Sequence, residues 1–142
     1  MNCKLPPEVQ AYLEAVEADK PRACPEQHAL AAHIRRCFET EDLLVDTEQL
    51  RRYLSLSRYF PYKDLFLWEQ FLTALWMCTY TSDGRPRWKT LFSMVGRGAG
   101  KDGFIAFISM CATSPYNPVG SYNVDICANN EEQAMTPVLD LV

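Results

Sequence analysis

A glycine-rich segment with one lysine holds the residues whose types and spacing could do chemistry. The segment consists of Gly96, Arg97, Gly98, Ala99, Gly100 and Lys101. Alternating glycines let a backbone curl until several amide N–H groups point at one anion. A lysine directly after such a curl can reach the β and γ phosphates of a nucleotide, and a helix that starts there adds the positive end of its dipole. The segment therefore predicts a phosphate-binding loop of the Walker A type.

Two positions depart from the usual pattern of such a loop. Val95 stands where the first glycine usually stands, so Gly96 comes one place late, and Asp102 replaces the serine or threonine whose hydroxyl holds Mg²⁺. A carboxylate is a hard oxygen ligand, so Asp102 is a candidate metal residue that would hold Mg²⁺ through a water molecule. Alternatively, Asp102 turns away and pairs with Arg97 or another basic residue. The other interpretation of the whole segment is a glycine-rich turn with an incidental lysine.

The elements around the loop are expected to position it. Residues 90–95 form a short apolar run that predicts a buried strand entering the loop, and the apolar residues 103–110 predict a buried helix leaving it. Residues 122–128 alternate apolar and polar side chains, which indicates a second strand. Asn130 is the expected cap of a last helix, which Pro137 would kink. The order strand, loop, helix, strand, helix predicts the start of a parallel α/β sheet with a crossover helix.

The N-terminal part is expected to be a helical leader. Three apolar stripes predict its helices: Val9, Tyr12, Leu13 and Val16; Leu30, Ile34, Cys37 and Phe38; and Leu50, Tyr53 and Leu54. Asp46 is the expected cap of the third helix, with Gln49 at the capping-box position three residues later. The apolar segment 65–80 predicts a buried helix, and residues 82–86 predict a turn. We expect a leader over residues 1–64 and the N-terminal part of an ATPase domain over residues 65–142. A complete nucleotide-binding sheet has about five strands, so we expect this one to be incomplete.

Composition and charge exclude several classes of protein. The chain of 142 residues is 48% hydrophobic and 23% charged, which is typical of an ordinary globular domain. Its net charge of −4 argues against a main DNA-gripping surface in this segment. The sequence predicts no signal peptide and no membrane-spanning helix, and we expect reduced cysteines in a cytosolic protein.

Three patches of the sequence resemble the large subunit of bacteriophage terminases, the ATPase that drives DNA into a capsid. Many members carry a deviant phosphate loop with an arginine before the Gly-Lys pair, and residues 96–101 are similar to it. Members also carry an apolar-Trp-Gln-aromatic signature upstream, similar to residues 67–71, and an Asn-x-x-Gln-Ala-like signature after the second strand, similar to residues 128–134. The helical leader also fits the family.

The resemblance implies an ATPase with the ASCE type of P-loop fold. It implies that Lys101 contacts the β and γ phosphates, that Arg97 stabilises charge near the γ phosphate, and that Gln70 lies near the adenine. Asn129 and Gln133 would support the nucleotide side of the sheet. The implied ligands are ATP and Mg²⁺. The family's acidic Mg²⁺ residue, catalytic glutamate and nuclease domain have no counterpart here, so we expect the chain alone to be a poor hydrolase.

The resemblance also implies partners and a place in the cell. A full-length protein of this kind would contact double-stranded DNA, mainly through parts that this sequence does not contain, and would bind the small terminase subunit and the portal protein, with a homo-oligomer as a further possibility. Viral genome packaging of this kind takes place in the cytoplasm of the bacterial host, without a membrane partner. Two alternatives stay open: a non-catalytic nucleotide-binding or assembly module, and another P-loop ATPase such as a helicase-like protein.

Two further groups of residues could do chemistry, and each has a simpler interpretation. Zinc ligands could be drawn from Cys24, His28, His33 and Cys37. One helix would carry all four of them, however, and a single helix cannot wrap a metal ion tetrahedrally. The basic pairs Arg35–Arg36 and Arg51–Arg52 are interpreted as solvated helix faces rather than as DNA contacts.

Overall fold

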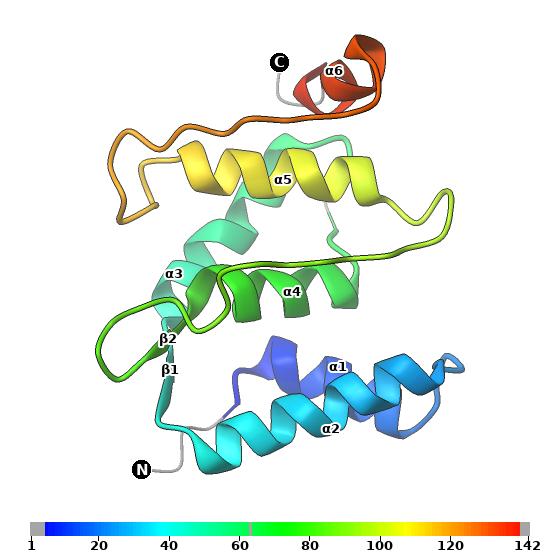
Figure 1. The fold of residues 1–142 in the computed structure, drawn as a ribbon, viewed down its shortest axis with the longest axis vertical. Coiled ribbons are helices and arrows are strands. Elements are labelled where there is room, and N and C mark those ends of the chain that lie inside the picture. Colours follow the sequence, from blue (N-terminus) through cyan, green and yellow to red (C-terminus); the bar gives the residue numbers. More distant parts are fainter. Residues whose placement is uncertain (1–4, 63, 140–142) are drawn as a thin grey trace. The chain divides into compact units, whose positions relative to one another are not determined.

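The computed structural model describes residues 5–62 and 64–139 of the chain. The described residues form six α-helices, one 3-10 helix and two short strands (Figure 1). In chain order these elements are α1 (Pro7–Glu17), α2 (Pro25–Thr40), β1 (Leu43–Val45), α3 (Thr47–Leu54), η1 (Ser55–Tyr59), α4 (Leu67–Cys78), β2 (Thr79–Thr81), α5 (Lys101–Thr113) and α6 (Glu131–Leu139). At the coarse level, the expected α/β class is confirmed as a helix-rich mixed fold with one two-stranded sheet.

The chain divides into two compact units. The first unit comprises the residues up to Leu50 together with Phe66–Leu91, and the second comprises Arg51–Leu65 together with the residues from Phe92 onward. The predicted division into a leader over residues 1–64 and an ATPase portion over residues 65–142 stays a prediction.

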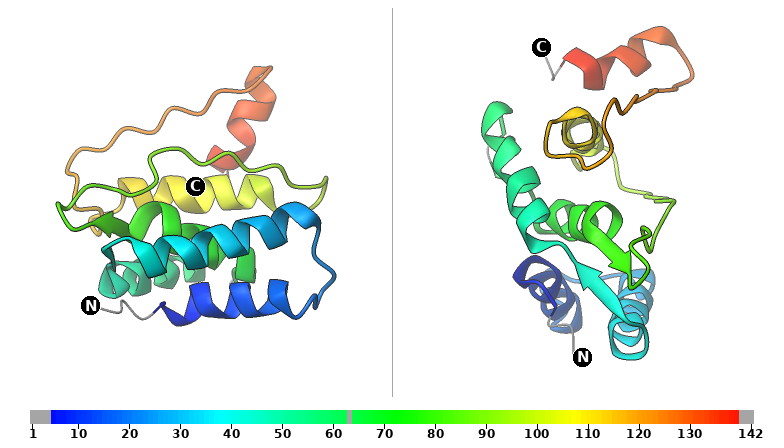
Figure 2. Two further views of the ribbon diagram at one scale, coloured as in Figure 1. Left: turned by 60° about the horizontal axis from the view of Figure 1, so that its bottom comes forward. Right: turned by 90° about the vertical axis from the view of Figure 1, so that its left-hand side faces the viewer.

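Three helices build the core of the first unit. Helix α1 packs against both α2 and α4 (Figure 2), and it buries Val9, Leu13 and Val16, whose spacing of three or four residues places them on one face. Between α1 and α4, the rings of Tyr12 and Phe71 stack with their centroids 4.2 Å apart. The predicted helical stripes of the leader are therefore confirmed, although Leu30 at the edge of the second stripe is 37% exposed.

The sheet of the first unit is antiparallel and connects two segments far apart in sequence. The strands β1 and β2 lie side by side (Figure 2, right), with Leu43 paired to Thr81 and Val45 to Thr79. The side chains of Leu43 and Val45 are buried in the core, whereas that of Leu44 is exposed. Asp46 caps the N-terminus of α3, as predicted: its carboxylate Oδ1 accepts a hydrogen bond from the backbone N–H of Gln49 at 2.8 Å. The predicted turn follows β2, where the Gly84 N–H donates to the Thr81 carbonyl at 2.8 Å.

The second unit is built around α5, which contacts both η1 and α6. Its buried side chains are Phe104, Ala106, Phe107, Ser109, Cys111 and Ala112, so the prediction of a buried helix is confirmed. The ring of Phe60, just after η1, meets the ring of Phe107 edge-on, with centroids 6.1 Å apart. Helix α6 begins where expected, because Asn130 Oδ1 accepts the backbone N–H of Gln133 at 2.8 Å, and Pro137 lies inside it.

Two predicted strands are wrong. Residues 90–95 and 122–128 run as stretches without helix or strand in the described part of the chain (Figure 1), so the expected parallel pairing is not formed there. Phe92 and Met94 are 86% and 87% exposed, and Tyr122 is 49% exposed. An apolar run becomes a buried strand only where a neighbouring strand and a covering layer pack against it, and the described residues form neither around these two segments.

No helix within the described residues is both long enough and apolar enough to cross a membrane.

Candidate phosphate-binding loop

The glycine loop leads directly into the N-terminus of α5. Gly96 and Ala99 close a turn, in which the Ala99 N–H donates to the Gly96 carbonyl at 3.2 Å. The next backbone hydrogen bond, from the Phe104 N–H to the Gly100 carbonyl at 2.9 Å, is the first of the helix. Lys101 is therefore the first helical residue, as the motif predicts.

Two of the three glycines are required by the backbone. Gly98 has φ +80° and Gly100, the residue that caps α5, has φ +84°, a region that side-chain-bearing residues adopt only with strain. Gly96 has no positive φ, and a Cβ built there would meet no atom within 4 Å. The curl of the loop thus depends on Gly98 and Gly100, while Gly96 is open to substitution.

The N-terminus of α5 offers backbone donors beside this curl. The N–H groups of Lys101, Asp102 and Gly103 precede the first N–H that the helix bonds to itself, so they have no partner within the helix. Such groups, together with the positive end of the helix dipole, attract anions. Residues 96–102 are exposed except Ala99 and Asp102, which are half-buried, so an anion can approach the loop from solvent.

Lys101 and Asp102 form an ion pair at this helix end, with Nζ 2.6 Å from Oδ1. Both side chains are about half exposed, at 58% and 49%, so water screens the pair. The contact matches the interpretation in which Asp102 pairs with a basic residue, although that residue is Lys101 and not Arg97. A carboxylate at a helix N-terminus is attracted to the positive end of the helix dipole, so Asp102 stabilises α5 whether or not a metal binds.

The structure brings together most, but not all, of the predicted site residues within one unit. Residues 96–102 are contiguous in the second unit, and Asn129 and Gln133 lie exposed at the start of α6 in the same unit. Gln70 lies half-buried in α4, which belongs to the first unit. Its predicted place near the adenine stays a prediction.

Two residues at the site, Tyr62 and Gly103, were not predicted from the sequence as part of it. The Tyr62 hydroxyl donates a hydrogen bond of 2.8 Å to the Gly103 carbonyl in the first turn of α5. A glycine inside an otherwise apolar helix was the available signal, because such a glycine often marks a close approach of another group. The tyrosine itself, 41 positions earlier in the sequence, carried no local signal of this contact.

The four candidate zinc ligands lie along one helix, as expected. Cys24 caps α2 and Cys37 lies near its end, 13 residues later, which corresponds to about 20 Å along the axis. His28 lies 3.5 Å from Asp19, and His33 lies 3.5 Å from the Cys37 sulfur. Among the residues that the structure describes, no group of three or more such side chains is placed to hold a metal ion.

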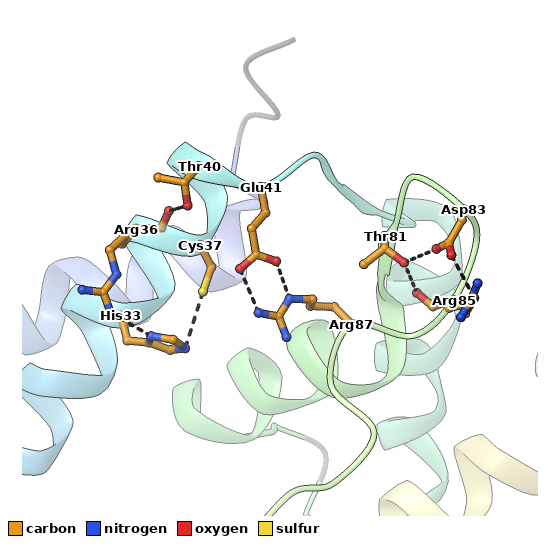
Figure 3. Close-up of polar contacts among 9 residues, drawn as sticks. All are labelled: His33, Arg36, Cys37, Thr40, Glu41, Thr81, Asp83, Arg85 and Arg87. Carbon is orange, nitrogen blue, oxygen red and sulfur yellow. Dashed lines mark hydrogen bonds and ion pairs between the residues drawn. The ribbon is translucent and has the colours of Figure 1, made fainter.

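A second polar cluster joins the end of α2 to the segment after β2 (Figure 3). Glu41 and Arg87 form a two-fold ion pair there, with Arg87 Nη2 2.8 Å from Glu41 Oε1. The Arg87 guanidinium lowers the pKa of Glu41, whereas burial raises the pKa of the neighbouring Cys37 thiol. Since a buried thiol with a raised pKa is a poor nucleophile, we interpret this cluster as an anchor for the turn and not as a catalytic centre.

Comparison of this chain with protein-family models, with curated proteins and with solved structures gave no match.

Proposed function

We propose that residues 96–102 bind the phosphates of ATP, and that the chain is the ATP-binding portion of a DNA-packaging motor of the large terminase type. The observation that supports phosphate binding best is local. A loop curled by Gly98 and Gly100 ends where α5 begins, with Lys101 as the first helical residue. The motor type rests on the resemblance of residues 67–71, 96–101 and 128–134 to that family.

In this proposal each loop residue has a defined task. Backbone N–H groups at the start of α5 donate hydrogen bonds to phosphate oxygens, and Lys101 exchanges its contact with Asp102 for the β and γ phosphates. Arg97, exposed in the turn, stabilises negative charge at the γ phosphate.

Mg²⁺ fits the chemistry of Asp102. Once Lys101 turns to the phosphates, the Asp102 carboxylate is left close to several negative oxygens, and a hard divalent cation held by that carboxylate offsets the repulsion. The ion supplies charge neutralisation of the triphosphate when bound.

The proposal extends to the complete motor. There, ATP hydrolysis would drive translocation of double-stranded DNA into the capsid, with the small terminase subunit and the portal protein as partners. It also includes a fold of the P-loop ASCE type, which the resemblance implies.

A fluorescent ATP analogue titrated against the purified chain tests this proposal. The wild type should bind in the presence of Mg²⁺, and Lys101→Ala should bind about 30- to 1,000-fold more weakly, because a charged contact to phosphate is lost. Lys89→Ala, which removes an exposed lysine before the loop, is the matched control and should bind like the wild type. Equal affinities for Lys101→Ala and the wild type would overturn the assignment.

One observation favours the second candidate, a non-catalytic nucleotide-binding module that acts in an assembly. The almost fully exposed Phe92 and Met94 lie directly before the loop, and exposed apolar side chains of this size are typical of surfaces that another chain covers. A module of this kind would bind the ATP analogue but would not gain hydrolytic activity when the remaining motor components are added.

A further inference from the structure

Tyr62 lies across the first turn of α5, at the position where a side chain of residue 103 would stand. A Cβ built on Gly103 would lie 2.7 Å from the Tyr62 hydroxyl oxygen and 2.8 Å from its ring carbon Cζ. Real Cβ atoms do not approach other atoms so closely, so Gly103 is required by the tyrosine. This contact explains why glycine, a weak helix former, occupies the first turn of a buried helix.

The ring of Tyr62 is itself held in place. It stacks on Phe60, with ring centroids 5.4 Å apart and an angle of 25° between the planes, and Phe60 packs edge-on against Phe107 of α5. Gly103 and Phe107 are four residues apart and therefore lie on the same face of the helix, one turn from each other. Residues 60–62 thus follow one face of α5 toward its N-terminus, and every one of these groups belongs to the second unit.

The hydroxyl of Tyr62 attaches the ring to the first turn of α5 through a hydrogen bond. It donates to the carbonyl of Gly103, two residues after Lys101 and three after the left-handed Gly100. A ring that is packed on one side and hydrogen-bonded at its tip restricts both the rotation and the translation of the first helical turn. The direction of the free N–H groups at residues 101–103 depends on that turn.

We propose that Tyr62 is a positioning residue for the phosphate loop, which it keeps preformed by clamping the first turn of α5 through Gly103. The inference rests on the proposed binding of ATP phosphates at residues 96–102. A preformed set of donors binds an anion more tightly than one that must be ordered on binding. Loss of the clamp should therefore weaken nucleotide binding without removing any group that touches the nucleotide.

Calorimetric titration of Mg-ATP into the whole chain tests this inference with four variants. Tyr62→Phe removes only the hydroxyl, and a lost neutral hydrogen bond corresponds to roughly 2- to 10-fold weaker binding. Gly103→Ala should weaken binding to a similar extent, because the new methyl group displaces the ring. In a Tyr62→Ala background, Gly103→Ala should cause no further loss, because no ring is left to displace. The control Tyr116→Phe changes an exposed tyrosine in the loop after α5 and should bind like the wild type.

The outcomes separate the inference from the proposed function. If the wild type itself does not bind Mg-ATP, the proposed function fails and the inference fails with it. If the wild type binds and Tyr62→Phe binds equally well, only the clamp is wrong. The clamp is also wrong if Gly103→Ala weakens binding by the same factor with and without Tyr62, since the effect would then lie in the loop backbone alone. Should Tyr62→Ala not fold, Tyr62→Phe decides the question, with the amide signals of residues 101–103 expected to shift in its NMR spectrum.

Discussion

The ammonium nitrogen of Lys101 lies 2.6 Å from a carboxylate oxygen of Asp102, its neighbour in sequence. An ion pair between two half-exposed side chains stabilises a protein by about 1 kcal/mol at most. Lys101 is therefore held close to the loop by a contact that a phosphate group can replace at little cost. The same replacement leaves Asp102 without its counter-charge, which makes this carboxylate the most informative position at the site.

We expect Asp102 to link nucleotide binding to Mg²⁺. In the wild type, the affinity for ATP should rise steeply with Mg²⁺ concentration, and Asp102→Ala should flatten that dependence, with the apparent Mg²⁺ affinity lowered by about tenfold or more. Asp125→Ala, which removes an exposed carboxylate elsewhere in the same unit, should leave the dependence intact. Titration of the ATP analogue at several Mg²⁺ concentrations measures this.

Two results would separate the alternatives for Asp102. Identical Mg²⁺ curves for the wild type and Asp102→Ala would exclude a metal-linked role. If Asp102→Ser instead tightened ATP binding without metal and left the Mg²⁺ dependence unchanged, the carboxylate would act only by repulsion.

The stability of the protein should hardly change when the apolar side chains directly before the loop are removed. Because Phe92 and Met94 are almost fully exposed, Phe92→Ala and Met94→Ala should each change the free energy of unfolding by about 0.5 kcal/mol or less. Phe71→Ala, in the core of the first unit, should cost about 3–5 kcal/mol. Urea unfolding curves give all three values. A loss of more than about 2 kcal/mol for Phe92→Ala would mean that this segment is a buried strand after all.

Much of the helical structure could be predicted because helices carry their signals locally. The stripe of α1, the cap at Asp46 and the cap at Asn130 all depend on residues within a few positions of each other. The strands could not be predicted in this way. Leu43–Val45 and Thr79–Thr81 are three residues each, and they pair across 30 to 40 positions of sequence, while the longer apolar run at 90–95 forms no strand. Strand formation depends on a partner that the local sequence does not name.

In the candidate site, too, the local features could be predicted from the sequence and the long-range contact could not. The glycine curl and the helix start at Lys101 were predicted, because both are properties of consecutive residues. The contact between Tyr62 and Gly103 was not, because it joins two segments through the packing of aromatic rings. An ion pair of Asp102 with Arg97 or another basic residue was among the alternatives, and the partner in the structure is Lys101.

At neutral pH, the first unit should be more stable with the uncharged amide of glutamine at position 69 than with the ionised carboxylate of Glu69. Its side chain is only 3% exposed, and its Oε2 accepts the backbone N–H of Phe66 at 2.8 Å, just before α4. Burial raises the pKa of Glu69 above its ordinary 4.5, despite the opposing hydrogen bond from Phe66. Its contribution to stability is therefore fully present below the pKa of the unfolded chain and is lost as the pH rises through the folded-state pKa.

Two substitutions at this position should have opposite effects. Glu69→Gln keeps an acceptor for the N–H and carries no charge, so it should raise the free energy of unfolding at pH 7 by up to about 1 kcal/mol, a gain that disappears below about pH 4. Glu69→Ala removes the acceptor and should cost about 1 kcal/mol. Urea unfolding at both pH values measures the difference. If Glu69→Gln were as destabilised at pH 7 as Glu69→Ala, the charge of Glu69 would be stabilising and the assigned sign would be wrong.

The cysteines should fall into two reactivity classes. Cys24 and Cys127 are exposed, whereas Cys37, Cys78 and Cys111 are buried, and burial strongly raises the pKa of Cys78. Because the thiolate is the reactive form, the buried thiols should react with a disulfide reagent only when the chain unfolds. The measurement uses a Cys3→Ser background, since Cys3 lies outside the described residues. Two thiols should then react rapidly, and Cys24→Ser with Cys127→Ser should abolish the rapid phase; a rapid phase that persists would contradict the burial of the other three.

The claim that residues 96–102 hold the phosphates of ATP is tested most directly by amide chemical shifts. Mg-ATP is titrated into the ¹⁵N-labelled chain while its two-dimensional NMR spectrum is followed, with Lys101→Ala as the comparison. We predict that the largest shifts fall on the N–H groups of residues 97–103, that they saturate with nucleotide, and that Lys101→Ala requires far more ATP to reach them. Shifts that are absent, or that cluster in another part of the chain and are unaffected by Lys101→Ala, would contradict the account.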